Sequence, residues 1–339
     1  IGAWLHDCGK ITTPEHVVDK ATKLETIYNR IHEVRMRFEV LLRDAQLERL
    51  QQLLDGHERA QADAQYQATA QALQEEFAFI ADCNIGGELM NPEHVGTLHK
   101  AAERTWLRHF DDRLGLSQAE LLRVAELPVA QLPARERLLA DKPQHIFPRP
   151  ETKDFDPKYG FQISVPEHLY NHGELYNLSI SKGTLTAEER FKINEHIIQT
   201  IVMLENLPLP SNLKRVPEYA GTHHETLLGT GYPRKLDKSQ LSIPARIMAI
   251  ADIFEALTAS DRPYKQAKTL SESIEILARL RDNGHIDADL FALFLRSEMP
   301  MRYAERHLHP DQIDTIDVER FVPTGQAEKP SAAGTLAGL

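Results

Sequence analysis

Apolar residues recur at helical spacing along most of this chain. Residues 24–54 show the pattern best, with a stripe formed by Ile27, Ile31, Val34, Phe38 and Leu41. Such a stripe is typical of an amphipathic helix, so we expect one long helix here. The Ala- and Gln-rich residues 58–82 resume the pattern after Gly56, which predicts a helical hairpin or coiled coil. No run alternates apolar and polar residues as a half-buried strand does, and an all-α fold is therefore predicted.

Capping signatures mark where further helices begin. In each, a small polar residue is followed by Glu within the first turn. Such starts are expected at Asn91-Pro92-Glu93, at Ser117 with Glu120, and at Thr186 with Glu189. Pro244, with Ser242 as its cap, is expected to open a helix that is apolar almost all round and therefore buried.

Two segments lack this helical pattern. Residues 132–176 are rich in proline and polar residues, which predicts a connector that runs over a surface and contributes nothing to a core. From about Pro323 the chain becomes rich in Gly, Ala and Ser, and residues 313–339 are expected to form a flexible tail.

Composition excludes several classes of protein. The net charge of −11 argues against a broad DNA- or RNA-binding surface, so a phosphate ligand must be met by a local cationic cluster or by metal. Cys8 and Cys83 cannot form a disulfide framework, and we expect a reducing, cytoplasmic environment. No apolar run approaches the ~20 residues of a membrane span.

The first five residues, Ile1-Gly2-Ala3-Trp4-Leu5, are mostly apolar and lead directly into His6-Asp7. A natural chain seldom begins in this way, and we expect a preceding segment. That segment is a candidate for a sensor or a membrane anchor, in which case this chain would be the cytoplasmic part of a larger signalling protein.

Histidine and aspartate gather in four short groups. Two of them, the His6-Asp7 pair before Gly9-Lys10 and the lone His196, do not identify a site when taken alone. A His-Asp dipeptide is common on surfaces, and a histidine on the inner stripe of a helix is usually a satisfied core residue. Both become informative only beside the other groups.

The other two groups are stronger signals. His223-His224 precedes a glycine-rich turn, and neighbouring imidazoles diverge, so the pair suits two metal ions better than one. Asp252 stands in an apolar helix, where a carboxylate is costly to bury unless it is paired with a base or binds metal. Together the groups supply four imidazoles and two carboxylates, a set suited to iron, manganese or a similar divalent ion rather than to thiolate-bound zinc.

These motifs, in this order and spacing, resemble the HD-GYP domains of the HD phosphohydrolase superfamily. The matching stretches are His6 to Lys10, Lys182 to Glu189 with His196, His223-His224-Glu225, Gly229 to Pro233, Asp252, and Asp261 to Lys265. The resemblance covers residues 1–30 and about 180–300. It implies an all-α, HD-GYP-type helical bundle formed by residues 1–30 and 180–312, with residues 31–179 as a large helical insertion and connector.

The resemblance also implies an activity. Such domains bind two or three divalent ions, commonly iron or manganese, and hydrolyse cyclic di-GMP to the linear dinucleotide, to GMP or to both. Two alternatives stay open: a phosphohydrolase of another cyclic dinucleotide or nucleotide, and a catalytically weak module that senses a nucleotide and signals. The expected partner is a cyclic dinucleotide, with no DNA or RNA, and the long insertion favours a homodimer.

The resemblance implies a role for each matching residue. The implied metal ligands are His6, Asp7, His196, His223, His224 and Asp252, with Asp7 bridging two ions and counted as catalytic. Lys10 would act beside the scissile phosphate, both in catalysis and in substrate binding. The other implied substrate-binding residues are Gly231, Tyr232, Arg262 and Lys265.

His32 is a competing candidate, because Lys20-Ala-Thr-Lys-Leu24 also resembles the family's lysine signature. The family places its histidine eleven residues after the leucine of that signature. The interval from Leu185 to His196 satisfies this spacing, whereas His32 follows Leu24 too closely. We therefore expect His196 to be the ligand.

Three departures from the family's pattern matter. The helix that carries the family's first metal ligands is absent before His6, so one ion would lack ligands in this chain. Glu255 stands where many members have Asp, one turn after Asp252. The insertion is expected to be a structural or dimerising arm rather than a second catalytic site, with Trp4 or Trp106 as candidate packing residues.

Overall fold

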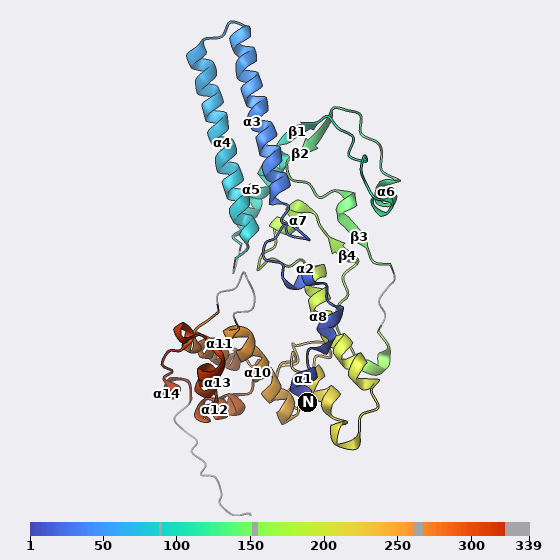
Figure 1. The fold of residues 1–339 in the computed structure, drawn as a ribbon, viewed down its shortest axis with the longest axis vertical. Helices are drawn as coiled ribbons and strands as arrows, with labels where there is room; N and C mark the ends of the chain where they lie inside the picture. The colour runs from blue at the N-terminus through green and yellow to red at the C-terminus, as the bar shows by residue number, and fades with distance from the viewer. Residues whose placement is uncertain (88–89, 151–154, 260–266, 323–339) are drawn as a thin grey trace, which may run out of the picture. The chain divides into compact units, whose positions relative to one another are not determined.

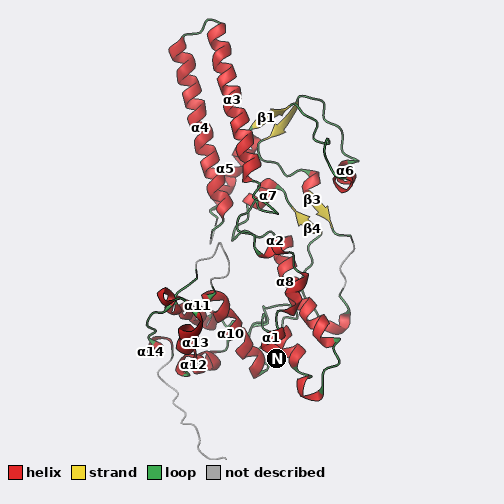
Figure 2. Cartoon of the chain, in the orientation of Figure 1, coloured by secondary structure: helices red, strands yellow, loops and turns green. Residues whose placement is uncertain are grey.

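The computed structural model describes residues 1–87, 90–150, 155–259 and 267–322 (Figures 1 and 2). The protein is all-α apart from two small two-stranded sheets, as predicted. Its backbone divides into two compact units. The first unit comprises Ile1–Asp7, Gly160–Gln162 and Thr200–Leu339, and the second comprises Cys8–Tyr159 and Ile163–Gln199.

The first unit is a set of short helices around an aromatic core. Its α-helices are α1 (Gly2–Leu5), α9 (Val216–Gly221), α10 (Ile243–Thr258), α11 (Leu270–Asp282), α12 (Ala288–Arg296), α13 (Met299–His307) and α14 (Val318–Phe321). The ring of Phe254 on α10 meets Phe294 at 5.2 Å and Tyr303 at 5.4 Å between centroids. These edge contacts fix α10 against α12 and α13.

Helix α10 differs in part from its prediction. Its first turn contains a proline, as expected, but the Ser242 side chain at the N-cap makes no capping hydrogen bond. Ile243 and Ile247 are 56% and 48% exposed, so the prediction of an entirely buried helix is wrong. The buried side chains lie on the opposite face, which packs against α9, α11 and α12, and the apolar residues simply outnumber the positions that this face covers.

The second unit contains the predicted helical hairpin. Helix α3 (Ile31–Leu54) packs along α4 (Arg59–Ile85), and Gly56 turns the chain between them with φ +83°. The predicted start of α3 at residue 24 is wrong, because the residues before Ile31 form an irregular turn. There the Leu24 backbone N–H donates to Asn84 Oδ1 at 2.8 Å, and Ile27 is exposed instead of extending the stripe.

Two antiparallel sheets in the second unit correct the expectation that no strands occur. Strand β1 (Thr105–Arg108) pairs with β2 (Ala134–Arg137), and β3 (Ile146–Pro148) pairs with β4 (His168–Asn171). Each strand has three or four residues, too few for alternation to stand out in the sequence.

The segment predicted as a surface connector also contributes to the core, contrary to expectation. Leu138 and Leu139 are 0% and 1% exposed, and they pack with the buried residues of α3 and α4. A short strand directly before them carries them into the interior.

The described part of the second unit has five further α-helices, and three of them, α5, α6 and α8, begin at predicted caps. The five helices are α2 (Glu15–Val18), α5 (Pro92–Glu103), α6 (Gln118–Val124), α7 (Glu174–Leu178) and α8 (Ala187–Glu205), whose last residues belong to the first unit. Asn91 caps α5, Ser117 and Glu120 form a reciprocal box at α6, and Thr186 and Glu189 do the same at α8. Short 3-10 turns lie at Cys8–Thr12 (η1), Pro143–His145 (η2), Pro157–Tyr159 (η3), Ser211–Leu213 (η4) and Pro310–Gln312 (η5).

The packing role predicted for Trp4 is wrong, because its side chain is 91% exposed on the short α1. Trp106 lies on β1 with its indole Nε1 buried. Within the described ranges, no helix combines the length and the apolar character that crossing a membrane requires.

Candidate metal centre

The first unit brings His6, His223 and Asp252 together. One potential ligand atom from each lies within 4.8 Å of the other two. Nε2 of His6 is 3.3 Å from Oδ1 of Asp252, and the rings of His6 and His223 meet edge-on at 4.8 Å. Three stretches that are far apart in sequence, at the ends of α1 and α9 and in the middle of α10, therefore converge on one small polar cluster.

Close backbone packing fixes the end of α9 from which His223 projects. A Cβ atom added to Gly221 would lie 2.4 Å from Cγ1 of Ile201, so a side chain at this position would push α9 away. Thr200 Oγ1 donates to the His6 carbonyl at 3.2 Å and holds the end of α1.

Backbone carbonyls orient both imidazoles. Nδ1 of His6 donates to the Ala3 carbonyl at 2.8 Å, and Nδ1 of His223 donates to the Ala220 carbonyl at 2.7 Å. A carbonyl only accepts, so in each ring the proton is on Nδ1 and the lone pair of the neutral ring is on Nε2. This second hydrogen bond is the usual way in which a protein prepares a histidine to ligate a metal.

The carboxylates of the cluster favour a positive charge. Hydrogen bonds to Asp252 and then to Asp7, whose Oδ2 is 3.2 Å away, raise the pKa of His6 to about 10 against the opposing effect of burial. Burial alone would raise the pKa of Asp252, but the His6 hydrogen bond and the neighbouring histidines hold it below its usual value. Burial lowers the pKa of His223 and keeps its imidazole neutral. The cluster thus combines imidazoles with carboxylates, a donor set that fits a hard or borderline divalent cation.

The loop that follows is built around Gly231 and Tyr232. The Tyr232 ring stacks on His224 at 4.8 Å between centroids with an angle of 18°, and His224 in turn lies 4.2 Å from His223. A Cβ on Gly231 would lie 2.5 Å from the Glu225 Cα, so only glycine lets the two backbone segments approach this closely.

Glu225 is a residue whose role sequence reasoning did not assign. Its side chain is buried and accepts the backbone N–H groups of Arg234 at 2.7 Å and Leu236 at 3.0 Å. Burial raises the pKa of Glu225 although these hydrogen bonds oppose the shift. The carboxylate therefore ties the far end of the loop to the His223-His224 segment, and its place as the third residue of a His-His-Glu string was the available signal.

The remaining predicted site residues either belong to the second unit or lie outside the described residues. His196 is buried on α8 in the second unit, with Nδ1 against the Ile193 carbonyl, and its place in the ligand set stays a prediction. Lys10 is exposed on η1, also in the second unit. Arg262 and Lys265 lie outside the described residues. His32, the competing candidate, is exposed on α3 beside Arg35.

Comparisons with known proteins agree with this geometry. Residues 133–290 match the HD domain family. A cyclic di-GMP phosphodiesterase of Pseudomonas aeruginosa is 43% identical over 136 residues, which are 40% of this chain and 30% of that protein. A cyclic di-GMP phosphodiesterase of Thermotoga maritima is 38% identical over 122 residues, 35% of this chain and 32% of that protein.

A third relative carries a different substrate in its name. The 3'3'-cGAMP-specific phosphodiesterase 1 of Vibrio cholerae is 27% identical over 197 residues, which are 56% of this chain and 44% of that protein. The chain thus spans less than half the length of these relatives.

The fold is helical, its His/Asp cluster could bind metal, and nearly half of the chain matches the HD domain family. The match and these relatives support an HD phosphohydrolase of the HD-GYP type.

Proposed function

We propose that this protein is a metal-dependent phosphodiesterase that opens cyclic di-GMP to the linear dinucleotide, to GMP or to both. The observation that supports it most directly is the convergence of His6, His223 and Asp252, with ligand atoms within 4.8 Å of one another. The names of the relatives supply the substrate class, since several are cyclic di-GMP phosphodiesterases.

In this proposal His6, Asp7, His196, His223, His224 and Asp252 would hold the divalent ions. The ions are iron or manganese, two or three in number. When bound, such ions make a water molecule nucleophilic near neutral pH and neutralise charge on phosphoryl oxygens. The protein works in the cytoplasm, where its substrate would be made and consumed.

The chain's own residues prepare this chemistry. The Ala3 and Ala220 carbonyls keep the Nδ1 protons in place, so that His6 and His223 offer Nε2. The loop at Gly231 and Tyr232 forms a wall beside His224, against which a nucleotide would be positioned. Lys10, Arg262 and Lys265 are proposed to bind the phosphates, as cations do wherever phosphate is recognised.

A second substrate, 3'3'-cGAMP, is favoured by one finding. The relative that aligns with more than half of this chain is named for that dinucleotide. Metal ligands do not distinguish bases, so parallel assays of both dinucleotides on the same preparation would decide between them. A ratio of specificity constants that favours 3'3'-cGAMP would overturn the assignment to cyclic di-GMP.

The decisive experiment couples metal analysis to turnover. The full chain, purified with iron or manganese, should hydrolyse cyclic di-GMP, and chromatography would identify the linear or monomeric product. His223→Ala should lose bound metal and turnover together, because binding of the ion depends on the ligand. His307→Ala, which changes an exposed histidine outside the cluster, is the matched control.

Two results would contradict the proposal. Full turnover by His223→Ala would remove the cluster from the reaction. Nucleotide binding by the metal-loaded wild type without any hydrolysis would instead support the alternative of a signalling module. The proposed homodimer is tested separately by light scattering.

A further inference from the structure

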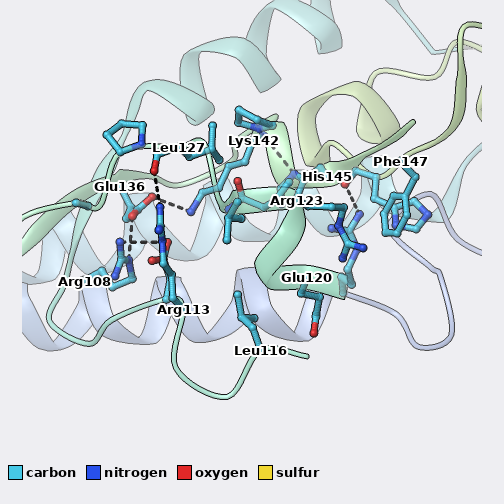
Figure 3. Close-up of a pocket in the computed structure, with 18 residues that line it drawn as sticks. Arg108, Arg113, Leu116, Glu120, Arg123, Leu127, Glu136, Lys142, His145 and Phe147 are labelled. Atoms are coloured by element: carbon cyan, nitrogen blue, oxygen red, sulfur yellow. Dashed lines mark hydrogen bonds and ion pairs between the residues drawn. The ribbon is translucent and has the colours of Figure 1, made fainter. Parts of the chain in front are cut away.

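The second unit contains a cavity of about 560 Å³ that lies outside the metal cluster (Figure 3). Every lining residue belongs to the second unit, and most come from 108–147, the region of β1, α6, β2 and β3. The volume lies within the usual range for small-molecule sites, about 300–1,000 Å³.

Cations outnumber carboxylates in the lining. The cations are Arg30, Arg108, Arg113, Arg123 and Lys142, and the carboxylates are Asp112, Glu120 and Glu136. Glu136 binds two of the cations, Arg108 at 2.9 Å and Lys142 at 2.8 Å, and Asp112 binds Arg108 as well at 3.2 Å. Two of the three carboxylates are thus concentrated on one pair of cations, the third, Glu120, accepts a hydrogen bond from Ser117, and the wall keeps an excess of positive charge.

Three arginines carry that excess. Among the residues that the structure describes, Arg30, Arg113 and Arg123 form no ion pair with a carboxylate. Arg113 and Arg30 donate instead to backbone carbonyls, those of Leu127 at 2.6 Å and His172 at 2.7 Å. Arg123 Nε is buried without any hydrogen-bond partner in the described part of the chain. A buried guanidinium nitrogen in this state costs free energy that an anion would recover.

The other end of the cavity is aromatic. Arg123 lies over the Phe147 ring at 4.4 Å, and the Phe147 and His172 rings are 4.8 Å apart. Figure 3 separates the two ends, with Arg108, Arg113 and Glu136 on one side and His145, Phe147 and Arg123 on the other. A ligand that binds both the cationic end and the aromatic end of the cavity must combine an anionic group with a flat ring.

Two imidazoles of the lining have lowered pKa values, because they are buried and because cations lie nearby. Burial, and then the charge of Arg30, lowers the pKa of His172 to about 3. Burial also lowers the pKa of His145, and the Arg30 and Lys142 charges act in the same direction. Both rings are therefore neutral at pH 7, and they add flat, hydrogen-bonding surface to the aromatic end without further charge.

We propose that this cavity binds a nucleoside monophosphate. Its phosphate would lie against Arg108, Arg113 and Lys142, where guanidinium groups can meet two oxygens at once, and its base would lie beside Phe147 and His172. The site is separate from the metal cluster and does not depend on the proposed phosphodiesterase activity. It gives the insertion a ligand of its own.

GMP is the probe that tests this inference on the full chain. Because GMP is also a product expected of the proposed reaction, binding is located by hydrogen exchange. Protection is expected in 113–127 and 142–147. Calorimetry should show GMP binding weakened about tenfold or more by either of two substitutions. Arg113→Met removes a charge-assisted contact to the phosphate, and Arg123→Met removes the guanidinium that lies over Phe147 at the base end. Arg43→Met, which removes an exposed arginine from α3, should bind GMP as the wild type does.

A second variant tests the cavity without changing any arginine, in case the arginine variants fail to fold. Ala130 is an exposed lining residue, so Ala130→Trp would fill the cavity while leaving every charge in place. It should abolish protection of 113–127. Guanosine, which lacks the phosphate, should bind about tenfold more weakly than GMP. The inference is overturned if GMP fails to bind, if it protects only segments of the first unit, or if Arg123→Met and Ala130→Trp both bind GMP normally.

Discussion

The metal cluster of the first unit and two ion pairs of the second bury charged groups in opposite ways. In the second unit Lys20 and Arg37 each meet a buried carboxylate: Lys20 Nζ lies 2.8 Å from Glu189, and Arg37 lies 2.8 Å from Glu174. In the first unit Asp252 faces an imidazole, and that imidazole faces a second carboxylate. The ion pairs of the second unit satisfy their own charges, whereas the cluster of the first unit gathers donors of the kind that ligate a cation.

This difference separates a structural role from a chemical one. A buried ion pair with complete hydrogen bonding holds elements together and attracts no further ligand, because its charges cancel. Where carboxylates and imidazoles surround one point, a single bound proton neutralises only part of the negative charge. We therefore expect substitutions in the second unit to change stability, and substitutions in the cluster to change metal binding.

Asp252→Asn should have the largest effect on function. It keeps the shape of the side chain but removes a carboxylate from the cluster. Even residues that merely support metal ligands typically change affinity or activity by about 10–100-fold, so we expect a loss of turnover beyond about 100-fold and a matching loss of bound metal. Asp311→Asn, at an 89% exposed carboxylate, is the control. Unchanged metal content in Asp252→Asn would abolish the distinction between the two units.

Lys20→Met should have the largest effect on stability. The Lys20 and Glu189 side chains are only 1% and 4% exposed, and the substitution leaves the carboxylate buried without its cation. Breaking such a pair typically costs about 3–5 kcal/mol. Urea unfolding should show this loss, while bound metal per folded chain stays constant. The matched control is Lys158→Met, at a lysine that is 59% exposed.

The double variant Lys20→Met with Glu189→Gln sharpens the test. Neutralising the stranded carboxylate should restore part of the lost stability. A double variant that is as unstable as the sum of two single variants would mean that the pair is not coupled.

The sequence indicated the metal cluster better than the fold around it. His6, His223 and Asp252 sit in short strings whose residue types already restrict the chemistry, and the resemblance of those strings to the HD-GYP motifs implied that they converge. The strands β1 to β4 were not predictable, because segments of three or four residues carry no periodic signal. The core role of Leu138 and Leu139 was likewise concealed among prolines.

One string was open to two interpretations in the sequence alone. Lys20-Ala-Thr-Lys-Leu24 resembles a lysine signature of the family, yet its lysines are structural in this fold. Lys20 pairs with Glu189, and Lys23 donates to the carbonyls of Leu178 at 2.9 Å and Ile180 at 2.8 Å. Such partners lie more than 150 positions away in the chain, and only the fold brings them together.

Gly231→Ala should have an intermediate effect on stability and turnover, and it changes only a loop of the first unit. The new Cβ would lie 2.5 Å from the Glu225 backbone, and overpacking of this kind typically costs about 1–3 kcal/mol. Because Tyr232 stacks on His224, we expect turnover to fall more than metal content. Gly96→Ala is the control: the position is open and helical, and alanine there should stabilise by about 0.5–1 kcal/mol. Thermal unfolding and metal analysis of both variants would show whether the loop is as tightly packed as inferred.

The smallest effect on stability is expected at the helix caps. The second unit offers one buried cap and one exposed cap for comparison. Thr186 and Ser117 each form a reciprocal box with a glutamate three residues later, but Thr186 is 2% exposed, whereas Ser117 lies on the surface. Replacing a cap by alanine costs about 0.5–2 kcal/mol, and we expect Thr186→Ala near the upper end of that range and Ser117→Ala near the lower. The reason is that Thr186 also holds Glu189 for its ion pair with Lys20. Equal losses of unfolding free energy in the two variants would show that the Thr186 cap and the buried Lys20–Glu189 ion pair act independently. The stability of the second unit would then rest on separate contacts rather than on a linked network.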